Sequence, residues 1–159
     1  MILVLLGTFV TEFKRPLLAL DSLCKKGIIT EEVIVQNGHT AIETDHLVLK
    51  PFISPKELDE LHKNARLIIT HAGTGSLIKA VGFQKKIIGV ARLLKFGEHV
   101  DDHQIEILEK FVELGYIMPW REEDELENIL NMIKDFNPIP FVSNKPVIMN
   151  YLSEYIDSL

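Results

Sequence analysis

Two polar turns, each placed after an apolar run, carry the residue types that could do chemistry in this chain. The first is Thr70-His71-Ala72-Gly73-Thr74-Gly75-Ser76, which follows the apolar run 67–69 and precedes a helical pattern. The second is Gly97-Glu98-His99-Val100-Asp101-Asp102-His103-Gln104, which opens another helical pattern. Because an open α/β sheet holds its ligand at the carboxyl ends of its strands, we expect both turns to line one crevice.

The first turn has the features of a phosphate site. Gly73 and Gly75 lack Cβ atoms, so we expect their backbone to approach a ligand closely and to adopt positive φ angles. The N–H groups of Thr74, Gly75 and Ser76 would open a helix, whose positive end attracts phosphate. The pattern predicts a phosphate-bearing small molecule, with a nucleotide sugar as the leading candidate. The alternative is an ordinary turn capped by the hydroxyl of Thr74 or Ser76, since a lone Gly-x-Gly is a weak signal.

The second turn is richer in side chains. Asp101 and Gln104 match a capping box, which would use both side chains locally at the start of the helix. That reading leaves Glu98, His99 and His103 unexplained. Side chains that both donate and accept hydrogen bonds suit the hydroxyls of a sugar ring. We expect Gln104 to face the same crevice as the first turn.

Three histidines, His71, His99 and His103, are candidates for proton transfer or metal binding. His71 ends a buried strand, where a histidine is either satisfied within the core or meets the diphosphate or sugar of the ligand. Together with Asp102, the three could form a zinc site, which would make the chain a His-dependent metallohydrolase. A zinc-protease helix carries His-Glu-x-x-His, whereas the residues between His99 and His103 are Val100-Asp101-Asp102 at the expected entrance of a helix, so we expect no bound metal.

Composition limits the class of protein. The chain has 159 residues, 47% hydrophobic and 25% charged, which suits one globular domain over residues 1–159. A net charge of −6 argues against a broad electrostatic grip on nucleic acid or anionic lipid. One cysteine, Cys24, argues against an internal disulfide framework and is typical of a reducing cytosol. The apolar run 1–6 has no basic flank and predicts a buried first strand rather than an export signal.

Apolar runs alternate with helical patterns along almost the whole chain. Strands are predicted at 1–6, 32–36, 47–50, 66–70, 86–91 and 116–118, and helices near 12–26, 55–64, 75–83, 102–114, 123–136 and 145–157. Short continuous runs of Val, Ile and Leu are typical of a parallel sheet covered on both faces. The alternation predicts an α/β fold with a Rossmann-like doubly wound parallel sheet. Gly27 and Gly115 are predicted to end helices, and Ser54-Pro55 to start one.

The last segment, residues 145–159, predicts an amphipathic helix. Val147, Tyr151, Tyr155 and Leu159 recur at a spacing of four and form a wide apolar stripe. We expect this stripe to pack on the chain's own sheet; contact with a partner subunit is the alternative.

Taken together, these segments resemble the glycosyltransferase family 28 C-terminal domain, and within it the PssE-like subunits of capsule and exopolysaccharide synthesis. The likeness rests on the segments 69–76, 87–90 and 97–104 and extends from the turn at 6–8 to about Trp120. It implies one half of a GT-B glycosyltransferase, the half that binds the UDP-sugar. The other half is then a membrane-anchored, acceptor-binding subunit (PssD-like) that holds a lipid-linked saccharide.

The resemblance also implies an activity. The chain would be the UDP-sugar-binding subunit of an inverting, two-component hexosyltransferase in cell-surface polysaccharide biosynthesis, and would be active only with its partner. UDP-sugar would be its substrate, with no cofactor, metal or nucleic acid. It would be cytoplasmic and peripheral at the inner face of the membrane through the partner. The alternative is a non-catalytic nucleotide-sugar-binding or enhancer subunit of an associated glycosyltransferase.

Residue roles follow from the same resemblance. The donor-binding set comprises Gly73, Thr74, Gly75 and Ser76 at the diphosphate, Glu98, His99, Asp102, His103 and Gln104 at the sugar, and Phe52 and Ile53 at the uracil. His71 and His103 are the catalytic candidates in this chain, although the general base is expected on the partner. The family's acidic ribose-binding residue is replaced by Leu77.

Overall fold

A computed structural model of the chain describes residues 1–158 and has a six-stranded parallel sheet at its centre. The strand order is β3-β2-β1-β4-β5-β6. The strands are β1 (Ile2–Leu5), β2 (Val33–Gln36), β3 (Val48–Lys50), β4 (Leu67–His71), β5 (Lys86–Val90) and β6 (Met118–Pro119). The chain order reverses between β1 and β4, and such a switch point is where open α/β sheets bind ligands.

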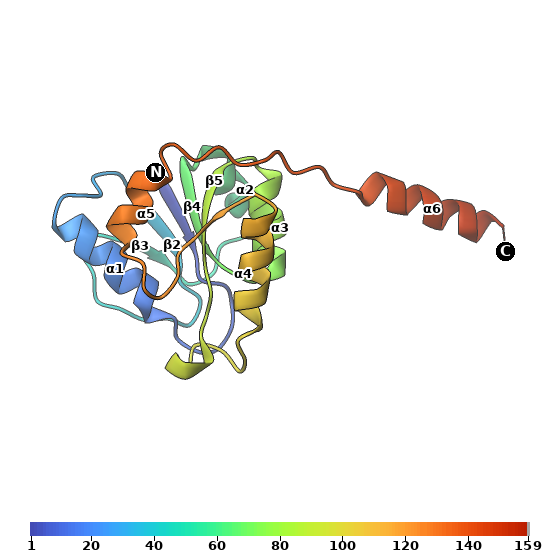
Figure 1. The fold of residues 1–159 in the computed structure, drawn as a ribbon. Coiled ribbons are helices and arrows are strands. Elements are labelled where there is room, and N and C mark those ends of the chain that lie inside the picture. The colour runs from blue at the N-terminus through green and yellow to red at the C-terminus, as the bar shows by residue number, and fades with distance from the viewer. Residues whose placement is uncertain (159) are drawn as a thin grey trace.

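Helices cover both faces of the sheet (Figure 1). They are α1 (Lys14–Lys25), α2 (Pro55–Asn64), α3 (Thr74–Gly82), α4 (His103–Glu113), α5 (Leu126–Met132) and α6 (Lys145–Asp157). Each predicted strand and helix has a counterpart in the structure, and the Rossmann-like sheet is confirmed. A short 3₁₀ turn, η1 (Leu94–Phe96), was not predicted.

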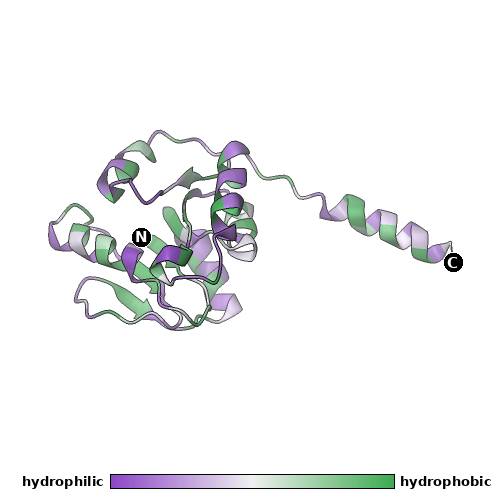
Figure 2. Ribbon diagram, turned by 60° about the horizontal axis from the view of Figure 1, so that its bottom comes forward, coloured by the Kyte–Doolittle hydropathy of each residue, from purple (hydrophilic) through white to green (hydrophobic). Residues whose placement is uncertain are grey.

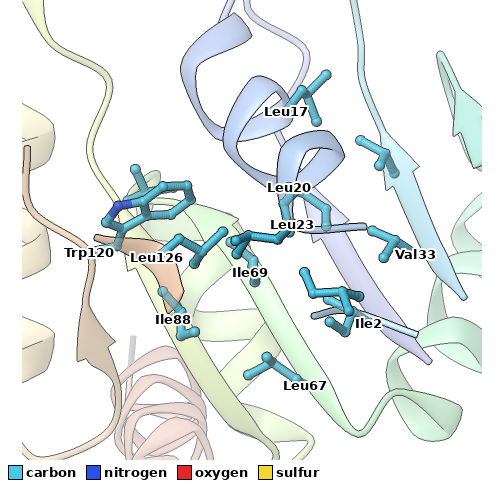
Figure 3. Packing of buried hydrophobic residues seen from close by; sticks show 14 of the residues in the cluster. Ile2, Leu17, Leu20, Leu23, Val33, Leu67, Ile69, Ile88, Trp120 and Leu126 are labelled. Atoms are coloured by element: carbon cyan, nitrogen blue, oxygen red, sulfur yellow. The ribbon is translucent and has the colours of Figure 1, made fainter. Parts of the chain in front are cut away.

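The core consists of two apolar layers, one on each face of the sheet. On one face Leu17, Leu20 and Leu23 of α1 pack with alternate strand residues such as Val33 and Ile69 (Figure 3). On the other face α3 and α4 pack against the intervening strand residues. Continuous apolar strands are therefore needed, because each successive side chain enters a different layer.

Strand register gathers several polar residues at one edge of the sheet. Leu5 pairs with Thr70, and His71 pairs with Val90, so β1, β4 and β5 end at nearly the same level. The segments that follow these strands carry the glycine turn and the polar turn. Both turns predicted to line the crevice therefore leave the same edge.

Helix boundaries follow the predicted capping residues. Gly27 and Gly115 adopt positive φ angles of 72° and 71° after helices, and the Ser54 side chain accepts a hydrogen bond from the N–H of Glu57. Helix α5 is shorter than predicted. Beyond Met132 the chain continues through i→i−3 hydrogen bonds to Phe136, so the helical pattern ends in tightened turns.

Helix α6 does not pack on the sheet, so that expectation is wrong. It lies apart from the body at the end of an extended segment, and none of its residues is buried (Figure 1). Apolar and polar residues alternate along it (Figure 2), and Val147, Tyr151 and Tyr155 are all more than half exposed. Leu159, the last residue of the predicted stripe, lies outside the described residues. Over residues 1–158, no helix is both long and apolar enough to cross a membrane.

Candidate functional site

The glycine turn presents the bare start of a helix at the carboxyl edge. Strand β4 ends at His71, and α3 begins at Thr74 with Gly73 as its N-cap residue. Gly73 has no side chain to accept from the first turn of the helix, and no hydroxyl caps it. The capping alternative is therefore not observed. The N–H groups at this helix start have no intrahelical acceptor and point out of the helix, as an anion site requires.

The two glycines of this turn differ in what surrounds them. Neither adopts a positive φ, so that prediction is wrong: Gly73 is extended (φ −75°, ψ 131°) and Gly75 lies within the helix. A Cβ at Gly73 would overlap the ring of His71, whereas a Cβ at Gly75 would meet nothing within 4 Å. Gly73 is therefore needed for internal packing, and Gly75 leaves open space beside the N–H groups.

His71 is held by both of its ring nitrogens. Nδ1 accepts a hydrogen bond from the N–H of Gly73 at 3.1 Å, so the neutral ring carries its proton on Nε2, which donates to Ser76 Oγ at 2.9 Å. Burial, followed by the positive charge of Arg92, lowers the pKa of His71 to about 4. At neutral pH His71 is uncharged, and its two hydrogen bonds join the strand end to the helix start. This pair of bonds is called the His71–Ser76 clamp below. Its assignment as a catalytic residue stays a prediction.

Glu98 does not face the crevice as an open carboxylate. It is only 5% exposed, and Arg15 donates to both of its oxygens, at 3.2 and 3.0 Å. The N–H of Leu93 donates to the same carboxylate at 3.0 Å. Glu98 therefore ties the polar turn to α1 and to the chain after β5, and its carboxylate is already engaged.

The predicted capping box is wrong. Asp101 Oδ1 accepts from the N–H of His103 at 3.1 Å, but Gln104 Oε1 accepts from the N–H of Arg92 at 3.2 Å instead of returning to Asp101. Asp102, the N-cap residue of α4, accepts from the N–H of Leu94 at 2.9 Å. Gln104 and Asp102 therefore anchor the turn to the segment after β5.

Two histidines of the polar turn remain available to a ligand. His99 stacks on Phe9, with ring centroids 4.7 Å apart, and its Nδ1 lies 3.0 Å from Asp101. His103 is 65% exposed and lies 3.3 Å from Glu106. His99 and Gln104 both act on the pKa of His71, so the two turns meet at the end of β4.

The predicted uracil-binding pair is split between surface and core. Phe52 is 60% exposed and meets His39 edge-to-face, with ring centroids 5.6 Å apart, whereas Ile53 is buried. An exposed ring at the carboxyl end of β3 can stack on a flat base. Leu77 is fully buried in the core, so this position offers no contact to a ribose.

Sequence reasoning overlooked Arg92, which lies at the centre of the carboxyl edge. Its side chain is 1% exposed, and its guanidinium donates to backbone oxygens of Leu6, Thr11 and Glu98. The available signal was a charged residue directly after the predicted strand 86–91. Arg15 and His39 were overlooked as well, because Arg15 contacts Glu98 and His39 contacts Phe52, and neither pair is close in the sequence.

The ligands needed for a zinc site are not brought together. Among residues 1–158, no three or more His, Cys, Asp and Glu side chains are grouped to hold a metal ion. His71, His99 and His103 each have the separate partners described above. The arrangement supports anion binding by backbone N–H groups.

Comparison of the sequence with known proteins identifies the family of the chain. The sequence profile described as "Glycosyltransferase family 28 C-terminal domain" matches residues 10–144. The UDP-N-acetylglucosamine transferase subunit ALG13 of Candida glabrata is 28% identical over 137 residues, which are 86% of this chain and 66% of that protein. The chain spans less than two thirds of the length of the curated relatives it matches.

Solved structures share the fold. The NMR structure of ALG13 superposes with a TM-score of 0.58 at 20% identity and covers 91% of each chain. MurG of Acinetobacter baumannii superposes with a TM-score of 0.56 at 18% identity over 82% of this chain and 39% of MurG. The sheet described above is thus one Rossmann-like domain of the GT-B glycosyltransferase fold.

Proposed function

Because the chain belongs to the glycosyltransferase family 28 C-terminal domain family, we propose that it is the donor-binding subunit of an inverting, two-component glycosyltransferase. It binds a UDP-sugar and transfers the hexosyl residue to a lipid-linked acceptor during synthesis of a cell-surface polysaccharide. The relatives' description as subunits of a UDP-N-acetylglucosamine transferase supports both the donor class and the need for a second subunit.

The observation that carries the proposal is the bare start of α3. Its first N–H groups lie beside Gly75, where a Cβ would meet nothing within 4 Å, and next to the His71–Ser76 clamp. Backbone N–H groups at a helix start bind phosphate because the helix dipole adds to their own positive charge. We assign the diphosphate to Gly73, Thr74, Gly75 and Ser76.

The remaining parts of the donor are assigned by chemistry. Phe52 stacks on the uracil, with Ile53 and His39 beside it. His99 and His103 face the sugar, while Glu98, Asp102 and Gln104 hold the turn that presents them. This division refines the predicted donor-binding set, in which all five residues contact the sugar directly.

In the proposed reaction, the acceptor hydroxyl attacks the anomeric carbon of the sugar in line. The new carbon–oxygen bond forms as the bond to UDP breaks, which inverts the anomeric centre. A general base on the partner takes the hydroxyl proton, since His71 is buried with a pKa of about 4. N–H groups of α3 stabilise the charge that grows on the diphosphate, so the step requires no metal.

The partner in this proposal is a membrane-anchored, PssD-like subunit that holds the acceptor. Helix α6 supplies the docking element, because its apolar side chains are exposed along its whole length and belong to no core. Binding would bury these side chains and hold the chain at the inner face of the membrane. An unpaired apolar surface of this kind marks an interaction site.

A reconstituted transfer assay tests the function. The chain, its membrane partner and one UDP-sugar at a time are mixed with lipid acceptor, with EDTA present in one arm. Sugar transfer that needs both subunits and survives EDTA supports the proposal. Transfer by the partner alone, at a rate that added chain raises, would favour the non-catalytic enhancer alternative. Calorimetry with UDP separates that case further, because a pure scaffold binds no nucleotide.

A further inference from the structure

We propose that Arg92 is a positioning residue for the donor site: its buried guanidinium joins the loop after β1 to the polar turn and supplies positive charge at the edge that holds the diphosphate. The inference rests on the proposed function, because it concerns how the same site holds its anionic ligand. Arg92 was not among the predicted site residues, and it touches no part of the glycine turn by a hydrogen bond.

The guanidinium connects segments that are far apart in the sequence. Nη2 donates to the carbonyl of Leu6 at 2.8 Å, at the end of β1. Nη1 donates to the carbonyl and the hydroxyl of Thr11 at 3.0 and 3.2 Å, and to the carbonyl of Glu98 at 2.9 Å. The backbone N–H of Arg92 binds Gln104 at the start of α4. One residue therefore fixes the loop before α1 and both ends of the polar turn.

Among residues 1–158, no carboxylate bonds the guanidinium of Arg92. All four acceptors of its guanidinium are neutral oxygens, and the Glu98 carboxylate is engaged by Arg15. This cluster therefore holds two arginines and one carboxylate, which leaves one positive charge in excess. Burying a charge is unfavourable unless an opposite charge compensates it. A diphosphate at the same edge of the sheet provides that compensation.

The field of Arg92 reaches the glycine turn. Burial is the main cause that lowers the pKa of His71 to about 4, and the charge of Arg92 is the next. His71 in turn bonds Gly73 and Ser76, which flank the proposed diphosphate site. Positive charge that disfavours a proton on His71 favours an anion beside it.

A purely structural role for Arg92 makes a different prediction. If the guanidinium only held the loops together, its loss would weaken binding of every ligand at this edge alike. A charge that acts on the diphosphate instead affects UDP and spares uridine, which has the same base and ribose but no phosphate. The ratio of the two affinities therefore separates the two roles.

Calorimetry on three variants tests the proposal. Arg92→Gln keeps an amide donor and removes the charge, Arg92→Lys keeps the charge, and Arg66→Gln removes an exposed arginine that pairs with Glu31 at the opposite edge. We expect Arg92→Gln to weaken UDP binding at least about tenfold and uridine binding less than about twofold. Arg92→Lys should remain within about threefold of wild type for UDP, and Arg66→Gln should change neither ligand.

Several outcomes would overturn the proposal. If a folded Arg92→Gln loses equal affinity for UDP and for uridine, Arg92 only holds the loops together. If Arg92→Gln does not fold by circular dichroism, a folded Arg92→Lys that has lost UDP affinity tenfold refutes the charge claim, and one that keeps it supports the claim. Wild-type protein that binds no UDP would sink the proposed function and this inference together, whereas normal UDP binding by all variants would sink the inference alone.

Discussion

The glycine turn at 71–76 and the polar turn at 97–104 have similar positions in the fold, but they use their polar groups in opposite ways. In the glycine turn the helix start is uncapped and the space beside Gly75 is open. In the polar turn Glu98, Asp102 and Gln104 are engaged with backbone N–H groups or with Arg15. Polar side chains near a site can thus hold its loops in place, which is called here the platform role, while backbone atoms contact the ligand.

Removing the buried carboxylate of the polar turn should have the largest effect, and that effect should be on stability. Glu98→Gln breaks the pair with Arg15, and we expect the free energy of unfolding to fall by about 2–4 kcal/mol. Urea denaturation measures this change. Glu106→Gln is the matched control on the neighbouring exposed carboxylate, for which we expect less than about 0.5 kcal/mol. Equal effects of the two substitutions would contradict the platform role.

Acid should act on the glycine turn through His71. The folded pKa of His71 is about 4 and the unfolded one is near 6.5, so below pH 6.5 the unfolded chain binds a proton that the folded chain does not. Stability from this group is complete above pH 6.5 and falls by up to about 3 kcal/mol as pH drops to 4. NMR titration of the His71 ring checks the prediction. Titration near pH 6.5 would show that the ring is not held as described.

Charge placed at the helix start should affect binding and leave stability intact. Gly75→Asp puts a carboxylate in open space at the positive end of α3, which favours the helix but repels a diphosphate. We expect UDP affinity to fall about 10²-fold with no loss of stability. Gly75→Asn is the neutral control of equal size and should bind at least about tenfold more tightly than Gly75→Asp. If the two variants bind UDP equally, the diphosphate is not at this helix start.

The smallest effect is expected at the exposed histidine of the polar turn. His103→Ala removes an exposed side chain that lies 3.3 Å from Glu106, so the transfer rate with the partner present should fall less than about tenfold. Steady-state kinetics measures this change. A loss of about 10³-fold or more, with normal UDP binding, would instead identify His103 as the general base.

Much of the fold could be predicted because its signals are local. Each buried strand is a continuous apolar run, and the helix ends at Gly27 and Gly115 carry their own glycine signals. The location of the glycine turn followed from the same pattern. Its conformation did not, because whether Gly73 needs positive φ or close packing depends on the ring of His71.

Long-range contacts account for what the sequence could not predict. Glu98 is bonded by Arg15, 83 residues away, and Arg92 by Leu6 and Thr11, so no spacing rule reveals them. Periodicity also predicts that α6 is amphipathic without showing what covers its apolar face. The expected packing on the sheet was wrong for that reason.

The most direct test of the central claim is a UDP titration of ¹⁵N-labelled protein, followed by the amide signals of residues 73–76. The account predicts that the amides of Thr74, Gly75 and Ser76 show the largest shifts, because their N–H groups bind the diphosphate. Large shifts elsewhere with these amides unmoved, or saturation by UDP with no change at the start of α3, would contradict it.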